Sequence, residues 1–251
     1  MRLFATTEMA LPHDQALSFP DPGSARGSAG IIKRPYIGEH LPGHPGERED
    51  LDPCPIAYLV KQEADCTIHP HFHRIAQFQV FVGGSGRFGQ RAIDGCQVHF
   101  ANAWSTYGPI VAGPEGVDYL VLRMRYAKGA GWMPAAREQL LQVPNRQPRN
   151  VVYPAFKIDT KRPERITLGD ESDGLGAWYV ALADGASTID PDPSSGGGQF
   201  TVALRGTLRN QDGVVLPALA VHFNTNDEPP MPWSACNGPA SLLQVRFPKI
   251  G

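Results

Sequence analysis

Three of the eight histidines in this 251-residue sequence fall within five positions, in the segment His-Pro-His-Phe-His. Successive side chains of an extended strand point to opposite faces, so His69, His71 and His73 are expected to share one face. Imidazoles that converge in this way can bind a divalent transition metal, for which histidine is the commonest ligand. The same spacing also fits a polar strand edge that faces solvent. Spacing alone therefore leaves a metal site and a surface strand as alternatives.

The composition indicates a protein built of many short strands. Hydrophobic residues make up 41% of the sequence and charged residues 19%, which is enough apolar mass for a core. The 27 glycines and 24 prolines favour strands joined by tight turns over a helical fold. A net charge of -2 without a basic patch argues against a nucleic-acid partner. No apolar stretch approaches the roughly 18 residues of a membrane helix, so no membrane association is expected.

The cysteines bear on the compartment. Cys54, Cys66, Cys96 and Cys236 are widely spaced and form no Cys-x-x-Cys pair, which argues against a zinc finger or a disulfide framework. The N-terminal stretch lacks the apolar core of a signal peptide. These observations predict a cytoplasmic protein.

Residues 1–50 are rich in proline, glycine and charge. They are expected to form an extended arm that wraps a body or a neighbour, anchored near Ile31 and Ile32, or else a disordered tail. A helix is expected over 134–142, with proline in its first turn. β-Branched and aromatic runs predict strands over 56–60, 76–82, 97–101, 117–124, 178–182, 200–204, 219–223 and 242–247.

The two halves of the sequence repeat each other. Tyr58-Leu59-Val60 matches Tyr179-Val180-Ala181 at an offset of 121. After one inserted residue, Gln77-Phe78 lies over Gln199-Phe200 and Gly84 over Gly206. A period of this length is the size of a small domain rather than of a solenoid unit. It predicts two copies of one all-β domain, with chance matching of glycines and valines as the alternative.

Each half resembles a cupin, and the whole chain resembles a two-barrel bicupin. The first cupin motif has two histidines one residue apart, then an acidic residue, then a glycine. His71, His73 and Gly84 take three of these places, and Gln77 stands where the family usually has glutamate. The resemblance implies two tandem cupin barrels (a double-stranded, jelly-roll-like β-helix). An arm at 1–50 would precede a site-bearing barrel at 51–145 and a degenerate, structural one at 146–251.

A metal site at the centre of the first barrel is what the resemblance implies. The metal would be Fe, Mn, Ni or Zn in the divalent state, and the expected ligands are His71, His73 and Gln77, with His69 as a further ligand. The family's third histidine falls near Thr106 in this sequence, so Tyr107, water or His69 would fill the remaining positions.

Further residues are candidates around this site. Tyr107 is expected to be catalytic and to orient a substrate together with Arg87 or Arg91, although arginines on such strands are commonly solvated. His99 is a second candidate ligand, or else a capped or surface histidine.

The second half lacks the histidines, and Asp190, Asp192 and Ser194 replace them. Two carboxylates could suit a hard cation, but the segment is more typical of a flexible loop. His222 is expected to be a packed or surface histidine.

Three functions remain open at this stage. Cupins include dioxygenases, isomerases and decarboxylases, which implies an enzyme acting on a small organic substrate. The second possibility is a non-catalytic sensor or storage module that binds a sugar or an aromatic acid in a barrel whose metal site is weakened or absent. The third is a structural protein. A homodimer paired through strand exchange is expected.

Overall fold

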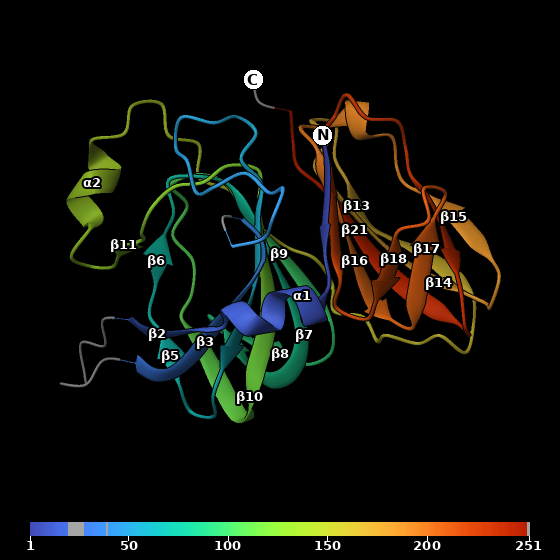
Figure 1. Ribbon diagram of the computed structural model, residues 1–251. Helices are drawn as coiled ribbons and strands as arrows, with labels where there is room; N and C mark the ends of the chain where they lie inside the picture. The colour runs from blue at the N-terminus through green and yellow to red at the C-terminus, as the bar shows by residue number, and fades with distance from the viewer. Residues whose placement is uncertain (20–27, 39, 250–251) are drawn as a thin grey trace. The chain divides into compact units, whose positions relative to one another are not determined.

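The computed structural model describes residues 1–19, 28–38 and 40–249 (Figure 1). The chain divides into two compact β units. The unit that we call the N-terminal barrel comprises His13–Gly38 and Pro45–Phe156. The other, the C-terminal barrel, comprises Met1–Pro12, Glu39–His44 and Lys157–Gly251. Antiparallel strands dominate both units, which confirms the all-β fold predicted from the composition.

The N-terminal barrel is built on a nine-stranded sheet. Seven strands follow the order β12-β9-β7-β10-β4-β3-β2, while β5 pairs with β10 and β8 with β7. A second, two-stranded sheet joins β6 to β11. The elements of this barrel are β2 (Gln15–Phe19), β3 (Ser28–Ile37), β4 (Ile56–Gln62), β5 (Thr67–Ile68), β6 (His71–Phe72), β7 (Gln77–Phe88), β8 (Arg91–Ile93), β9 (Gln97–Ala101), β10 (Ile110–Arg123), β11 (Gly131–Trp132), α2 (Arg137–Leu141) and β12 (Asn150–Val152).

The C-terminal barrel combines a six-stranded sheet in the order β1-β19-β16-β21-β14-β13 with a four-stranded sheet in the order β15-β20-β17-β18. A 3-10 turn, η1 (Leu11–His13), lies at the boundary between the units. The other elements are β1 (Arg2–Ala5), α1 (Thr7–Ala10), β13 (Glu164–Asp170), β14 (Gly176–Leu182), β15 (Ser187–Ile189), η2 (Pro193–Ser195), β16 (Gln199–Arg205), β17 (Thr207–Asn210), β18 (Val215–Pro217), β19 (Val221–Asn224), β20 (Pro232–Ala235) and β21 (Ala240–Arg246).

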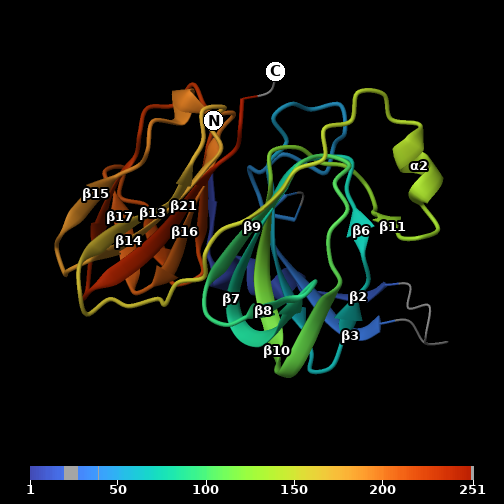
Figure 2. The same ribbon diagram turned by 180° about the vertical axis from the view of Figure 1, so that it is seen from behind.

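The two large sheets share one strand order. β9, β7, β10, β4 and β3 of the first correspond to β19, β16, β21, β14 and β13 of the second. Figure 2 labels β7, β9 and β10 of the first sheet and β14, β16 and β21 of the second. Gln77 and Gln199 begin the equivalent strands β7 and β16. Gly84 and Gly206 have φ values of 75° and 72°, and a Cβ at either would collide with the backbone of an adjacent segment. The repeat read from the sequence therefore agrees with the structure.

One part of the predicted repeat alignment is wrong by a residue. The pairing of β4 with β10 and of β14 with β21 places Tyr58 over Trp178, and not over Tyr179. A slip of one residue turns a strand side chain to the other face. Tyr58 accordingly lines the interior of its barrel, whereas the hydroxyl of Tyr179 donates to the carbonyl of Asp159 at 2.7 Å.

The segment expected to be a separate arm is divided between the units. β1 pairs with β19 in the C-terminal barrel, whereas β2 and β3 extend the sheet of the N-terminal barrel. Ile31, one of the expected anchors, is buried in the core of the N-terminal barrel. Sheet edges offer unpaired N–H and C=O groups that an added strand can satisfy. Residues 20–27 and 39 of this segment lie outside the described part of the chain.

Two further boundaries differ from the sequence-based expectation. The expected helix over 134–142 forms only at Arg137–Leu141, and the two units divide between Phe156 and Lys157 rather than near 145. No helix in the described ranges is long and apolar enough to span a membrane.

Candidate functional site

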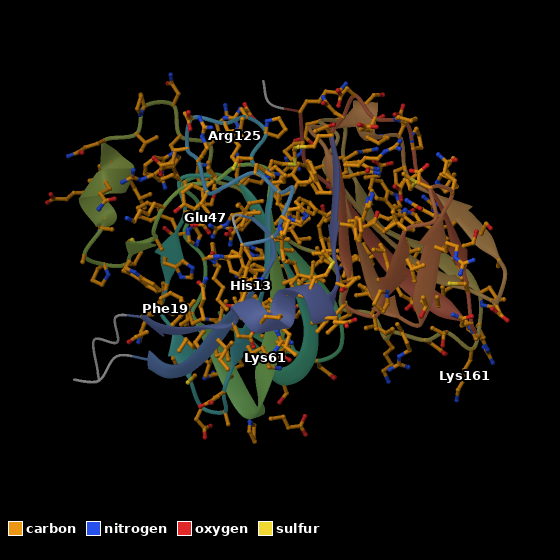
Figure 3. All side chains as sticks on the ribbon, in the orientation of Figure 1. His13, Phe19, Glu47, Lys61, Arg125 and Lys161 are labelled. Carbon is orange, nitrogen blue, oxygen red and sulfur yellow. The ribbon has the colours of Figure 1, made fainter. Side chains whose placement is uncertain are left out.

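The interior of the N-terminal barrel contains a cavity of about 390 Å³. Its wall is formed by side chains of β2, β4, β7 and β10, by the segment around His71, and by the loop that follows β10. Phe19 and Glu47, two of the lining residues, are labelled in Figure 3. The wall also includes Lys33, Ile56, Tyr58, Val60, Ile68, His71, His73, Gln77, Gln79, Tyr107, Tyr119, Val121, Arg123, Lys128 and Trp132.

His71 is fixed in the cavity wall by backbone pairing on two sides. Its N–H donates to the carbonyl of Tyr107 at 3.1 Å, and the N–H of Tyr107 donates back at 3.0 Å. Trp132 of β11 is its cross-strand neighbour on the other side. The His71 ring therefore lies between two aromatic rings, 4.6 Å from that of Tyr107 and 4.9 Å from that of Trp132. The His73 ring is 5.2 Å from the His71 ring.

The hydrogen bonds of these two imidazoles define their tautomers. Nδ1 of His71 is 2.8 Å from the carbonyl oxygen of His69, and Nδ1 of His73 is 2.9 Å from that of Gly129. A carbonyl only accepts, so each Nδ1 carries the hydrogen and each Nε2 is the basic atom. Burial lowers the pKa of His71 to about 4, and burial together with Arg123 lowers the pKa of His73. Both rings are therefore neutral at pH 7.

Gln77 connects a buried cation to a buried phenol. Its Oε1 accepts from Nε of Arg123 at 3.0 Å and from Nη2 at 2.8 Å. Its Nε2 donates to the hydroxyl of Tyr107 at 2.5 Å. These three bonds fix the orientation of the amide, with its oxygen toward the guanidinium. The Arg123 side chain also lies 5.6 Å from the centroid of the Tyr58 ring.

The cavity carries an excess of positive charge. Nζ of Lys33 lies 3.3 Å from Oε1 of Glu47, so the charges of these two residues balance each other. Burial raises the pKa of Tyr107 and of Tyr119, so both phenols remain protonated. Arg123 is 5% exposed and forms no ion pair with a carboxylate of the described residues. Its guanidinium is thus the buried charge that the barrel leaves uncompensated.

Three of the seven predicted site residues do not reach the cavity. His69 precedes Pro70 and lies outside β6, so the three histidines do not occupy one continuous strand, and its side chain is not part of the wall. Arg87 and Arg91 lie at the exposed end of the β7–β8 hairpin. The positions of these residues therefore do not support the predicted ligand role of His69 or the predicted substrate-binding roles of the two arginines. His71, His73, Gln77 and Tyr107 do converge.

His99 is a buried structural histidine rather than a ligand candidate. Its Nδ1 lies 2.9 Å from Oε1 of Gln79 and its Nε2 lies 3.1 Å from Oδ1 of Asn150. Both ring nitrogens are therefore engaged, and the side chain does not line the cavity. Burial lowers its pKa to about 4.

Arg123 is the site residue that sequence reasoning missed. It ends the apolar run of β10, a strand that the sequence did predict. Side chains two apart share a strand face, and Tyr119, Val121 and Arg123 all line the cavity. The alternation along β10 therefore indicates that Arg123 faces the cavity, once the pairing of β10 with β7 is known.

The donor set fits a divalent transition metal in part. His71 and His73 have the tautomer that metal-binding histidines adopt, with Nδ1–H on a carbonyl. Gln77 does not fit a third position, because Arg123 already engages its oxygen. Within the described ranges, no group of three or more His, Cys, Asp or Glu side chains is arranged to hold a metal ion.

In the C-terminal barrel, Asp190 corrects the expectation of a flexible loop. It is 3% exposed and accepts from Thr201 Oγ1 at 3.3 Å, from Trp233 Nε1 at 3.0 Å and from the Gln244 amide. Burial raises its pKa to about 7. His222 is 2% exposed and packs edge-on against Trp233, as expected for a packed histidine.

The fold defined by these barrels is that of the cupins. No family model matches the sequence, and no curated protein matches it. Solved structures do match over nearly the whole chain. A candidate dioxygenase from Nostoc punctiforme has a TM-score of 0.59 at 14% identity, covering 99% of this chain and 83% of that one.

Two further structures match at similar levels. Pirin YhhW from Escherichia coli, in complex with nickel(II), has a TM-score of 0.58 at 10% identity and covers 100% of both chains. A mutant of oxalate decarboxylase OxdC from Bacillus subtilis has a TM-score of 0.57 at 12% identity, covering 99% of this chain and 77% of that one. At these identities the similarity establishes the fold, and the chemistry must be argued from the residues of the site.

Proposed function

We propose that the N-terminal barrel binds a small organic molecule in its cavity, next to a divalent transition metal held by His71 and His73. The observation that supports this most strongly is the pair of Nδ1–H tautomers, which makes Nε2 the basic atom of both rings. The neighbour pirin is described in complex with nickel(II), which supports a transition metal in this fold.

The bound metal would act as a Lewis acid that polarises a carbonyl or hydroxyl oxygen of the ligand. Tyr107 is the residue best placed to assist. Its oxygen accepts from Gln77, its O–H remains available as a donor, and its raised pKa keeps that proton in place. Tyr107 would therefore orient a ligand oxygen as a donor and not act as a base. An enzyme of the dioxygenase or isomerase type is the activity proposed on this basis.

Metal analysis of untagged protein tests the ligand assignment. Wild-type protein is expected to retain about one equivalent of transition metal per chain, and the His71→Ala, His73→Ala double variant to retain none. His99→Gln is the control, because His99 is a buried histidine of the same barrel that does not line the cavity. Full metal content in the double variant, at a fold confirmed by circular dichroism, would contradict the assignment.

A second candidate is a non-catalytic module that binds a small molecule without metal. The observation that favours it is the use of the Gln77 oxygen by Arg123, which leaves only two imidazoles for a metal. Metal-free wild-type protein whose melting temperature rises with a small-molecule ligand would support this candidate over the enzyme. A wild-type protein that binds neither a metal nor a small molecule would contradict both candidate functions.

A cytoplasmic location and a homodimer belong to the same proposal. No disulfide joins the four cysteines, all of which lie in the described ranges, and this supports a reducing compartment. Size-exclusion chromatography with light scattering tests the dimer.

A further inference from the structure

We infer that the ligand of the N-terminal barrel is a small monocarboxylic acid and that Arg123 is its counter-ion. This inference deepens the proposed function and rests on it, because it assigns the chemical class of the molecule bound in the same cavity. It starts from the donors of Arg123 that the protein leaves unused.

The guanidinium has five N–H donors in a planar fork. Gln77 Oε1 takes one from Nε and one from Nη2. The described residues form no hydrogen bond with Nη1. The edge formed by Nη1 and the second Nη2 hydrogen is therefore available, and this is the edge that a carboxylate binds with two parallel bonds.

Charge points to the same ligand class. A buried cation without a counter-ion costs several kcal/mol, and removing water around it requires an anion or a full set of acceptors. Gln77 supplies a neutral oxygen, and the Lys33–Glu47 pair is already balanced. Besides Arg123 and Lys33, the remaining cation among the described wall residues is Lys128, whose side chain is exposed. One uncompensated buried charge matches a monoanion better than a phosphate dianion.

The amide of Gln77 is what keeps that charge available. Resemblance to cupins places a glutamate at this position, and a carboxylate there would neutralise Arg123 within the protein. Glutamine holds the same guanidinium in place through the same oxygen but adds no charge. We therefore assign Gln77 as the positioning residue for Arg123.

The rest of the wall suits an apolar, flat ligand body. Aromatic rings of Phe19, Tyr58, Tyr119 and Trp132 line the cavity alongside Val60 and Val121. Aromatic side chains contribute large contact areas and favour stacked or edge-on rings. An aromatic acid is the class that combines this body with a carboxylate.

Calorimetric titration of purified protein with benzoate and with benzamide separates charge from shape, because the two probes are nearly isosteric. Wild-type protein is expected to bind benzoate at least about tenfold more tightly than benzamide. Arg123→Met should abolish this preference, and Arg87→Met, an exposed arginine of the same barrel, should retain it. Inorganic phosphate should not compete at equal concentration.

Gln77→Glu is a second variant, which retains Arg123 and an acceptor oxygen for its guanidinium. It should also lose the preference for benzoate, because the new carboxylate neutralises the guanidinium. Equal binding of acid and amide by the wild type would overturn the inference while leaving the proposed function standing. Benzoate preference that persists in Arg123→Met would also overturn it. Failure of the wild type to bind either probe would count against the proposed function and the inference together.

Discussion

Gln77 and Gln199 begin equivalent strands of the two barrels, yet only Gln77 bonds to the arginine of the neighbouring strand. Gln199 stands directly opposite Arg246 in the register of β16 and β21. Arg246 instead donates to the carbonyls of Gly174 and Asp192 and pairs with a carboxylate. Both amide atoms of Gln199 are buried and have no hydrogen-bond partner among the described residues. Equivalent positions thus line a cavity in one barrel and the packed interior in the other.

Replacing each glutamine by leucine should therefore have opposite effects. Gln199→Leu removes unsatisfied buried polar atoms and is expected to stabilise the protein by about 1 kcal/mol. Gln77→Leu removes the acceptor of the buried Arg123 and is expected to lower the free energy of unfolding of the protein by about 2–3 kcal/mol. Urea unfolding at pH 7 measures both. Equal destabilisation by the two changes would mean that the pairing of Gln77 with Arg123 has no energetic role.

Gln77→Glu should strengthen metal binding while it weakens binding of acids. A carboxylate at position 77 would remain paired with Arg123 and would neutralise its positive charge, which lowers the electrostatic cost of placing a divalent cation beside His71 and His73. Competition against a chromophoric chelator is expected to show a higher affinity for nickel(II). Gln90→Glu adds the same charge at an exposed position and is the control. An unchanged or lower nickel affinity in Gln77→Glu would argue against a metal between these imidazoles.

Asp190 should make the stability of the protein fall as the pH rises. Its folded-state pKa of about 7 lies above its unfolded value, so its favourable contribution is complete below pH 3.8 and is lost by about pH 7. Asp190→Asn should therefore unfold at a higher urea concentration than wild type at pH 8, with the gap closing toward pH 4. Histidines that destabilise the fold at low pH are common to both proteins and cancel in this comparison.

The neighbouring Asp192 supplies the control for that experiment. Its pKa is lowered by hydrogen bonds from Ser194, so its contribution is lost only as the pH falls below about 4. Asp192→Asn should not change the slope of stability between pH 4 and pH 8. The interpretation of Asp190 as a buried, partly protonated carboxyl would be wrong if both variants changed that slope equally.

Glycine at the aligned positions 84 and 206 should be required in both barrels. Gly84→Ala and Gly206→Ala each combine a positive φ with a Cβ that collides with backbone, so each is expected to cost about 3 kcal/mol or more. Gly185→Ala has the same positive φ but open space around the Cβ, and should cost only about 1 kcal/mol. Thermal unfolding distinguishes the two cases. A loss at Gly185 as large as at Gly84 would mean that φ alone determines the cost.

Local pattern was sufficient to predict much of this molecule. The Gly- and Pro-separated apolar runs located the central strands, and β9 was predicted to the residue over 97–101. The His-x-His spacing and Gln77 singled out residues that line one cavity. These features lie within short segments, whose side-chain alternation is set by the strand itself.

The residues that were missed depend on pairing between distant segments. Arg123 matters because β10 places it beside Gln77, 46 residues earlier in the chain. Tyr58 could be aligned correctly with Trp178 only after the register of both sheets was known. Arg87 and Arg91 were assigned a substrate-binding role from the resemblance to cupins, whereas their exposure follows from the β7–β8 hairpin that carries them.

Electron density inside the N-terminal barrel is the most direct test of the proposed site. We expect a crystal structure of untagged protein, grown with benzoate, to show a metal peak bonded to Nε2 of His71 and of His73. The same map should show a carboxylate on the free edge of Arg123. A cavity that contains only water, or imidazoles of His71 and His73 turned into bulk solvent, would contradict the account.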